Sequence, residues 1–202
     1  MADVKVSVIY YSATGSVYRL AQQAVEAAEK AGAEVRLRKV RELAPQEAIE
    51  SNEGWSKHAL ETQDVVEASA EDVVWADAVI FGTPTRYGNV SAQLKQFLDT
   101  LGPQWSQGQL ADKVYTGFVS TGTQHGGQES TLLALYNTIH HFGGVVVAPG
   151  YTDPLKFADG NPYGVSHATG GGNDVPLGEP QFAALDHMAE RIIRIAGKLK
   201  SE

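Results

Sequence analysis

The alternation of short apolar segments with amphipathic helical segments is the feature that most constrains the fold of this chain. Five β-rich segments are predicted as strands: residues 4–11, 34–40, 77–82, 114–119 and 145–148. Helices are predicted where apolar residues recur at helical spacing: residues 17–31, 91–101, 129–142 and about 181–200. Strands that alternate with helices in this way form a doubly wound parallel sheet with right-handed crossovers. The sequence therefore predicts one α/β domain over residues 1–202, with helices on both faces of the sheet.

Two stretches of the chain carry weaker patterns. Residues 41–70 are acidic and mixed, and they are predicted to form a long loop that contains some helix. Residues 149–180 are rich in Gly, Pro, Asn and Asp, which favours loop, and the glycine run at 170–172 is interpreted as a flexible part of it. Neither stretch indicates a linker between domains.

Charge and cysteine content exclude several functional classes. The formal net charge of −8 and the pI of about 5.2 argue against nucleic acid or an anionic membrane surface as the main partner, because phosphate binding requires clustered Lys and Arg. The sequence has no long apolar run for a membrane span and no export leader, so a cytoplasmic protein is expected. The chain lacks cysteine, and His58 and His125 have no partners at ligand spacing, so no metal site is predicted. Redox chemistry would therefore depend on a bound cofactor.

The loop after the first predicted strand indicates a phosphate site. Ligands of open parallel sheets bind beyond the carboxyl ends of the strands, and residues 12–16 (SATGS) join the first strand directly to a helix. Hydroxyl groups and free backbone N–H groups at a helix start bind a terminal phosphate. The loop lacks the lysine of a P-loop and the G-x-G-x-x-G pattern, which favours a monophosphate over a nucleoside triphosphate or a dinucleotide. The alternative is that these small residues only cap the helix.

Two more loops that follow predicted strands are candidates for the same site. Residues 84–89 combine a proline, a glycine and Tyr87, and main-chain groups of this loop can recognise the carbonyls and nitrogens of a ring. The glycine-rich residues 120–127 allow the main chain to approach a flat ligand closely. Simple turns between strands and helices do not explain three such loops at one edge of a sheet, so a binding site is predicted there.

Several motifs resemble those of one family. S-x-T-G-S after the first strand is similar to the phosphate loop of flavodoxins. Four further features resemble the WrbA family of flavodoxin-like, FMN-dependent NAD(P)H:quinone oxidoreductases: GTPTRYGN at 82–89, the aromatic stretch around Trp105, STGT with GGQE at 120–129, and the pair His140-His141. The similarity covers about residues 3–200. It implies a flavodoxin-like three-layer sandwich whose five-stranded sheet has the order 2-1-3-4-5.

The resemblance also implies a cofactor, partners and residue roles. It implies non-covalent FMN, NAD(P)H as reductant, a quinone as substrate, and a homotetramer (a dimer at low concentration) in which more than one subunit shapes each site. His141 would be the catalytic residue that reaches the flavin, and Trp105 and Thr14 would lie at the substrate site. The residues implied to bind FMN are Ser12, Ala13, Thr14, Gly15, Ser16, Val17, Pro84, Thr85, Arg86, Tyr87, Gly88, Asn89, Ser120, Thr121, Gly122, Thr123, Gln124, Gly126 and His141.

The sequence departs from the family pattern in two loops. Members commonly carry an aromatic residue where Thr14 stands and often His where Ser16 stands, and Thr14 cannot stack on a nicotinamide. The third loop is one residue longer than in some members, with His125 near the insertion. The alignment of residues 123–126 therefore stays open.

The hypothesis for function is a ping-pong reaction. NAD(P)H transfers hydride to flavin N5, and a quinone then takes its place and is reduced by two electrons to the hydroquinone. His141 is the candidate for stabilising charge or supplying a proton, since imidazole titrates near working pH. The alternatives are a flavodoxin-type electron carrier that docks on basic partners through its acidic surface, and an interaction protein in which FMN is structural or absent. From the residues alone, His141 could simply end a helix, and Trp105 could fill the core or an oligomer contact.

Overall fold

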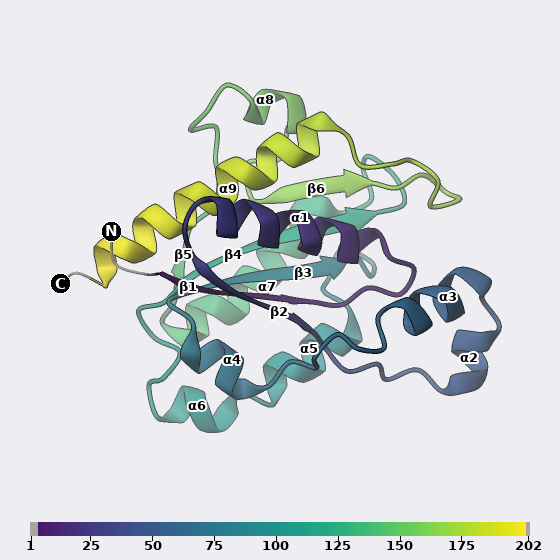
Figure 1. The fold of residues 1–202 in the computed structure, drawn as a ribbon, viewed down its shortest axis with the longest axis horizontal. Helices are drawn as coiled ribbons and strands as arrows, with labels where there is room; N and C mark the ends of the chain where they lie inside the picture. Colours follow the sequence, from purple (N-terminus) through teal and green to yellow (C-terminus); the bar gives the residue numbers. More distant parts are fainter. Residues whose placement is uncertain (1–3, 201–202) are drawn as a thin grey trace.

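A parallel sheet forms the centre of the protein (Figure 1). The structure is a computed structural model that describes residues 4–200. The strands are β1 (Lys5–Tyr10), β2 (Glu34–Lys39), β3 (Ala78–Pro84), β4 (Val114–Thr121), β5 (Val145–Val146) and β6 (Val165–Ala168). They pair in the order β2-β1-β3-β4-β5 through parallel ladders, and β6 also pairs with β4. The predicted order 2-1-3-4-5 is confirmed.

The fifth position of the sheet is divided between two short strands. β5 pairs with the first residues of β4, whereas β6 pairs with its last residues. The segment 147–164 between them leaves the sheet and contains the short helix α8 (Lys156–Asp159). The predicted strand at 145–148 is confirmed, although it has only two residues, whereas the prediction of loop throughout 149–180 is wrong because α8 and β6 lie within that stretch. After the insertion the chain returns to the sheet as β6. The Gly and Pro residues around β6 are typical of loops, so the sequence pattern does not indicate a strand there.

Helices cover both faces of the sheet, as predicted. On one face, α1 (Ser16–Lys30) and α9 (Glu179–Leu199) lie side by side (Figure 1). The opposite face is covered by α4 (Ala70–Trp75), α5 (Ala92–Asp99) and α7 (Gln128–Phe142). The shorter helices are α2 (Gln46–Glu50), α3 (Glu53–Glu61) and α6 (Gly102–Ser106). Within residues 4–200, no helix combines the length and the apolar character that crossing a membrane requires.

Alternation of side chains along the strands creates two apolar cores. In β1, Val6, Val8 and Tyr10 pack with α1 and α9, whereas Ile9 packs with the helices of the opposite face. Because helices cover both faces of the sheet, neither side of a central strand is exposed to solvent. This explains why the central strands are mostly apolar. β2 lies at the edge of the sheet, and its charged side chains stay partly exposed.

One carboxylate holds the segment 41–61, which contains α2 and α3, against the sheet. Glu42 accepts hydrogen bonds from the Tyr11 hydroxyl (2.9 Å), the Trp55 indole N–H (3.2 Å) and the Gln93 amide (2.8 Å). Burial raises the pKa of Glu42, but the bonds from Gln93, Tyr11 and two backbone N–H groups lower it, and the net shift is downward. The ionised carboxylate therefore connects α3 to α5 and to Tyr11, the residue that follows β1.

A buried ion pair fixes the insertion 147–164. Lys156 and Asp159 pair with each other without exposed side-chain surface, and the Lys156 ammonium also donates to the Gly164 carbonyl at 3.0 Å. Burial lowers the pKa of Lys156 and raises that of Asp159, while the attraction between the two charges opposes both shifts. Gly164 lies so close to the sheet that a Cβ atom there would be 2.3 Å from the Gly117 carbonyl oxygen. The insertion is therefore tightly packed where it returns to the sheet.

Candidate functional site

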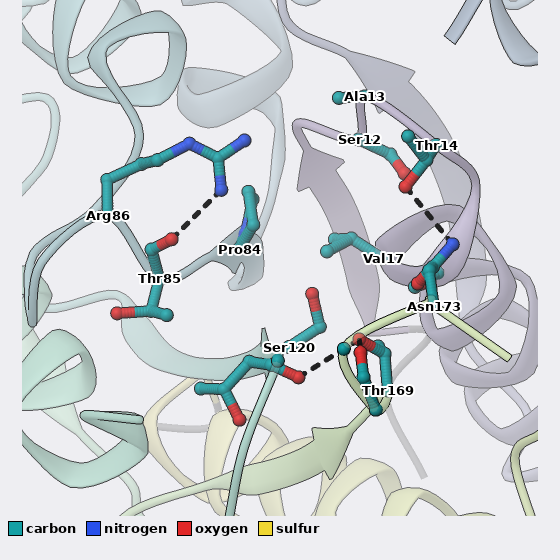
Figure 2. Close-up of a pocket in the computed structure, with 15 residues that line it drawn as sticks. Ser12, Ala13, Thr14, Val17, Pro84, Thr85, Arg86, Ser120, Thr169 and Asn173 are labelled. Carbon is teal, nitrogen blue, oxygen red and sulfur yellow. Dashed lines mark hydrogen bonds between the residues drawn. The ribbon is translucent and has the colours of Figure 1, made fainter. Parts of the chain in front are cut away.

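Loops at the carboxyl ends of the strands surround a cavity of about 250 Å³ (Figure 2). Its lining includes residues from all three loops that the sequence places at the site, so the structure brings these loops together. The predicted residues that line it are Ser12, Ala13, Thr14, Ser16, Val17, Pro84, Thr85, Arg86, Ser120, Thr121 and Gly122. A fourth segment, residues 169–173, completes the wall. We call this space the cofactor cavity.

The first loop presents the start of a helix to the cavity. Gly15 has a φ of +96°, a left-handed conformation that favours glycine, and this turn lets α1 begin directly after the loop. No described side chain caps the first turn of α1, so its N–H groups remain available for an anion. Ser12 Oγ accepts a hydrogen bond from Gly15 N at 3.1 Å, which keeps the loop closed. The phosphate interpretation requires such free N–H groups, and the alternative of a simple helix cap stays open.

Hydrogen bonds tie the second loop to the third. Thr85 N donates to the Ser120 carbonyl at 2.8 Å, and the Thr85 hydroxyl lies 2.8 Å from the Thr131 hydroxyl of α7. The Arg86 guanidinium donates to the Thr85 carbonyl at 2.9 Å, and Arg86 also lines the cavity (Figure 2). Hydrogen bonds therefore join two walls of the cavity directly.

Some residues predicted to bind the cofactor lie outside this lining. They are Gly15, Tyr87, Gly88, Asn89, Thr123, Gln124, Gly126 and His141. Tyr87 is fully exposed at the tip of its turn and has a φ of +54°. Gln124, together with His125, lines a separate cavity of about 350 Å³. Of the second and third loops, only the first halves, residues 84–86 and 120–122, line the cofactor cavity in a single chain.

The segment 169–173 is a part of the wall that the sequence interpretation missed. Asn173, with a φ of +57°, donates to the Thr14 hydroxyl at 3.2 Å and accepts a hydrogen bond from the Ser16 hydroxyl (Figure 2 shows the bond to Thr14). The glycine run at 170–172, interpreted as flexible loop, therefore connects β6 to the first loop. A glycine-rich run after a strand is a signal of this kind of loop, but the strand before it was not predicted.

Trp105 and His141 contact each other but do not line the cofactor cavity of their own chain. The Trp105 indole N–H donates to the His141 carbonyl at 2.7 Å, and both side chains are exposed. α7 begins at Gln128 beside the third loop and has 15 residues, which corresponds to a length of about 20 Å. His141, near its far end, is therefore remote from the cavity within one chain.

A buried histidine packs behind the first loop. His58 of α3 is 5 % exposed, and its Nδ1 would be 3.5 Å from a Cβ atom placed on Gly15. Burial lowers the pKa of His58; Glu61 opposes this shift, and two nearby cations increase it. The sequence interpretation considered His58 only as a metal ligand and missed this position. Among residues 4–200, no three His, Asp or Glu side chains are arranged to hold a metal ion.

Acid is expected to destabilise the wild type more than a His58→Gln variant. The unfolded chain binds a proton at His58 near pH 6.5, whereas the folded chain resists protonation because burial lowers the pKa. The unfolded state therefore binds more protons below this pH. The free energy of unfolding then falls by at most about 1.4 kcal/mol for each pH unit, until the pKa of the folded state is reached. Urea unfolding at about pH 7.5 and about pH 5.5 measures the loss in both proteins; an equal loss in both would contradict this role.

Comparison of the sequence with known proteins finds relatives along the whole chain. The family model described as NADPH-dependent FMN reductase matches residues 4–153. A Deinococcus radiodurans protein named NAD(P)H dehydrogenase (quinone) is 44% identical over 199 residues, which is 98% of each chain. A Methanosarcina acetivorans protein of the same name is 39% identical and covers 97% of this chain and 98% of its own.

Solved structures support the same fold. The WrbA-like flavodoxin protein from Agrobacterium tumefaciens superimposes with a TM-score of 0.66 at 24% identity, over 97% of this chain and 99% of that one. A flavodoxin from the domain Archaea gives a TM-score of 0.60 at 14% identity, over 97% and 99% of the two chains. The chain therefore belongs to the family of NADPH-dependent FMN reductases, and its curated relatives are NAD(P)H dehydrogenases (quinone).

Proposed function

We propose that this protein is an FMN-dependent NAD(P)H:quinone oxidoreductase that reduces quinones by two electrons to hydroquinones. The observation that carries this proposal is the cofactor cavity, where a helix start without a capping side chain meets two loops at the carboxyl ends of β3 and β4. The family match and the names of the relatives support the same activity.

The residues of the cavity fit FMN bound without a covalent link. The start of α1 and the hydroxyl groups of the first loop suit a phosphate group. Glycines leave room for a flat ring: a Cβ atom on Gly122 would approach only the Gly170 carbonyl, at 4.0 Å, and one on Gly171 would meet nothing within 4 Å. A cavity of about 250 Å³ encloses only part of such a nucleotide, so the rest of the ring stays accessible to a substrate.

We propose a ping-pong order in which NAD(P)H and the quinone use this site in turn. Bound FMN supplies the redox chemistry, because its ring accepts hydride at N5 and donates it again. Main-chain groups of residues 84–86 and 120–122 would hold the ring, and the bond between Thr85 and Ser120 keeps these two segments in register. The rigid walls orient each substrate against the same face of the ring.

We further propose that the protein forms a homotetramer, with dimers at low concentration, and that His141 and Trp105 act in the site of a neighbouring subunit. Both side chains are exposed and remote from the cavity of their own chain. In a neighbour's site, the indole can stack on a flat substrate, and the imidazole can stabilise charge or supply a proton to the quinone oxygen. Light scattering measures the assembly, and a monomer that is fully active would contradict this arrangement. A cytoplasmic location stays a prediction from the sequence.

An anaerobic stopped-flow experiment tests the proposed reaction. FMN-loaded protein is mixed first with NADH or NADPH and then with benzoquinone, while the flavin absorption band is followed. We expect the band to bleach with the nicotinamide nucleotide and to recover rapidly with the quinone. If FMN binds but is not reduced, the electron-carrier alternative is favoured, and if FMN does not bind, the proposal fails.

A pair of variants at Ser16 tests where the phosphate binds. Ser16→Asp places a carboxylate at the start of α1, and we expect it to weaken FMN binding about 100-fold because like charges repel in this buried position. Ser16→Asn has nearly the same shape without the charge and is the matched control. Quenching of FMN fluorescence measures both affinities; equal affinities would place the phosphate elsewhere.

A further inference from the structure

A second cavity, with a volume of about 450 Å³, lies along α1. One wall is formed by α1, and the other by the segment 173–177 together with Phe182 at the beginning of α9. Asn173 lines both this cavity and the cofactor cavity, so the two spaces share a wall. We call the second cavity the α1 groove.

Polar side chains form a stripe along the α1 side of the groove. Arg19, Gln22 and Glu26 are three and four residues apart, so they share one face of the helix. Seven residues of helix span about 10 Å, and over this distance the stripe changes from a cation through an amide to a carboxylate. The Arg19 end is next to the cofactor cavity, because the Arg19 guanidinium lies 3.4 Å from the Ser16 hydroxyl.

Arg19 occupies a position where a helix disfavours a cation. It belongs to the first turn of α1, and the partial positive charge of the helix start repels it. Its side chain is exposed, and among residues 4–200 no carboxylate lies within salt-bridge distance of its guanidinium. Arg19 is also the one cation in the lining of the groove. An anion bound between the two cavities would stabilise this arrangement.

We infer that the α1 groove receives the adenosine diphosphate half of NADH, with the pyrophosphate beside Arg19. The inference rests on the proposed function, in which the nicotinamide half enters the cofactor cavity. The Gln22 amide then hydrogen-bonds the adenine edge, and Phe182 supplies apolar surface for the base. Because the FMN phosphate is proposed to bind at the start of α1, the Arg19 charge also reduces repulsion between the two nucleotides.

Glu26, at the outer end of the stripe, makes the groove selective for NADH over NADPH. A carboxylate accepts a hydrogen bond from the free 2′-hydroxyl of the ribose, whereas it repels a 2′-phosphate. We expect kcat/KM to be at least about fivefold higher with NADH than with NADPH, and we expect Glu26→Gln to narrow this ratio. Equal values with both nucleotides in the wild type would overturn the role of Glu26.

Three probes test the groove on the FMN-loaded, full-length protein. NADH contains both halves, reduced nicotinamide mononucleotide lacks the adenosine half, and ADP-ribose lacks the nicotinamide. We expect ADP-ribose to bind in isothermal titration calorimetry. We also expect NADH to bleach the flavin band at lower concentrations than reduced nicotinamide mononucleotide does.

Variants of the stripe distinguish the groove from the cofactor cavity. Arg19→Gln removes the cation, and Gln22→Trp fills the groove from an exposed position on the helix. Each is expected to weaken ADP-ribose binding about tenfold and to impair NADH much more than reduced nicotinamide mononucleotide. Arg194→Gln removes an exposed arginine from α9 outside the groove. It is the charge-matched control and is expected to behave like the wild type.

Three results would overturn the inference. They are absence of ADP-ribose binding, equal concentration dependence for NADH and reduced nicotinamide mononucleotide, and loss of FMN affinity in Arg19→Gln as large as the loss of ADP-ribose affinity. The last result would assign Arg19 to the FMN phosphate instead. Failure of the proposed function is a different result, because neither reductant would then bleach the flavin, and the calorimetric titration with ADP-ribose would still test the groove.

Discussion

Replacement of Lys156 by methionine is expected to destabilise the folded protein by about 3–5 kcal/mol. The Lys156 ammonium and the Asp159 carboxylate pair with each other without exposed side-chain surface. Methionine fits the volume of the lysine stem but leaves a carboxylate buried without its counter-ion. The remaining carboxylate must then be protonated or move into water, and either change loosens the insertion 147–164.

A double variant separates the loss of the pair from the cost of the charge left behind. Lys156→Met/Asp159→Asn keeps both side-chain volumes and removes both charges, so most of the lost stability should return. The surface pair Lys95–Asp99, with side-chain exposures of 51% and 63%, provides the control, and Lys95→Met should change stability by less than about 1 kcal/mol. Urea unfolding measures all three variants. A double variant as unstable as Lys156→Met would show that the buried charge is not the cause.

Gly164→Ala is expected to cost about 3 kcal/mol or more, and to weaken FMN binding as well. A Cβ atom on Gly164 would lie 2.3 Å from the Gly117 carbonyl oxygen and 2.9 Å from a Leu132 methyl carbon. The first of these is a main-chain atom of β4 and cannot rotate away, so β6 must move. Because β6 leads into residues 169–173, this movement would shift one wall of the cofactor cavity.

Gly102→Ala is the matched control for this substitution. A Cβ atom on Gly102 would meet nothing within 4 Å, so stability should change by less than about 0.5 kcal/mol. Thermal unfolding and titration with FMN, applied to both variants, measure the two expected effects. A Gly164→Ala variant that is destabilised but binds FMN normally would separate β6 from the site.

The central strands could be predicted because their burial on both faces leaves a local signal. β1, β3 and β4 are almost entirely buried, and their apolar runs do not depend on which helix covers them. β6 has only four residues, two of them Ser166 and His167, and it follows Gly164. Its place in the sheet depends on pairing with the end of β4, more than forty residues earlier. A single sequence carries no signal of that pairing.

As with the fold, only those parts of the candidate site that have a local sequence signal could be predicted. The three loops follow from the strands before them, and the structure brings the first loop together with the first halves of the other two at one cavity. Asn173 and His58 reach the first loop through the path of the chain in space, and nothing in their local sequence indicates it. For His141, the family resemblance implies a role, whereas the structure shows only that its side chain does not line the cavity of its own chain; its action in a neighbouring subunit is our proposal.

The division of the fifth strand has a consequence for how proteins of this type can diversify. β5 and β6 pair with consecutive parts of β4, so the chain leaves the sheet and returns to it at nearly the same place. The outer part of the insertion carries the stacked rings of Tyr151 and Phe157, both exposed, whereas the returning end is anchored at Gly164. Evolution can therefore change the exposed residues of the outer part, as long as the buried pair Lys156–Asp159 is kept, without altering strand register or the nucleotide loops. We expect homologues to vary most at these exposed residues, so that new molecular contacts arise independently of the redox chemistry.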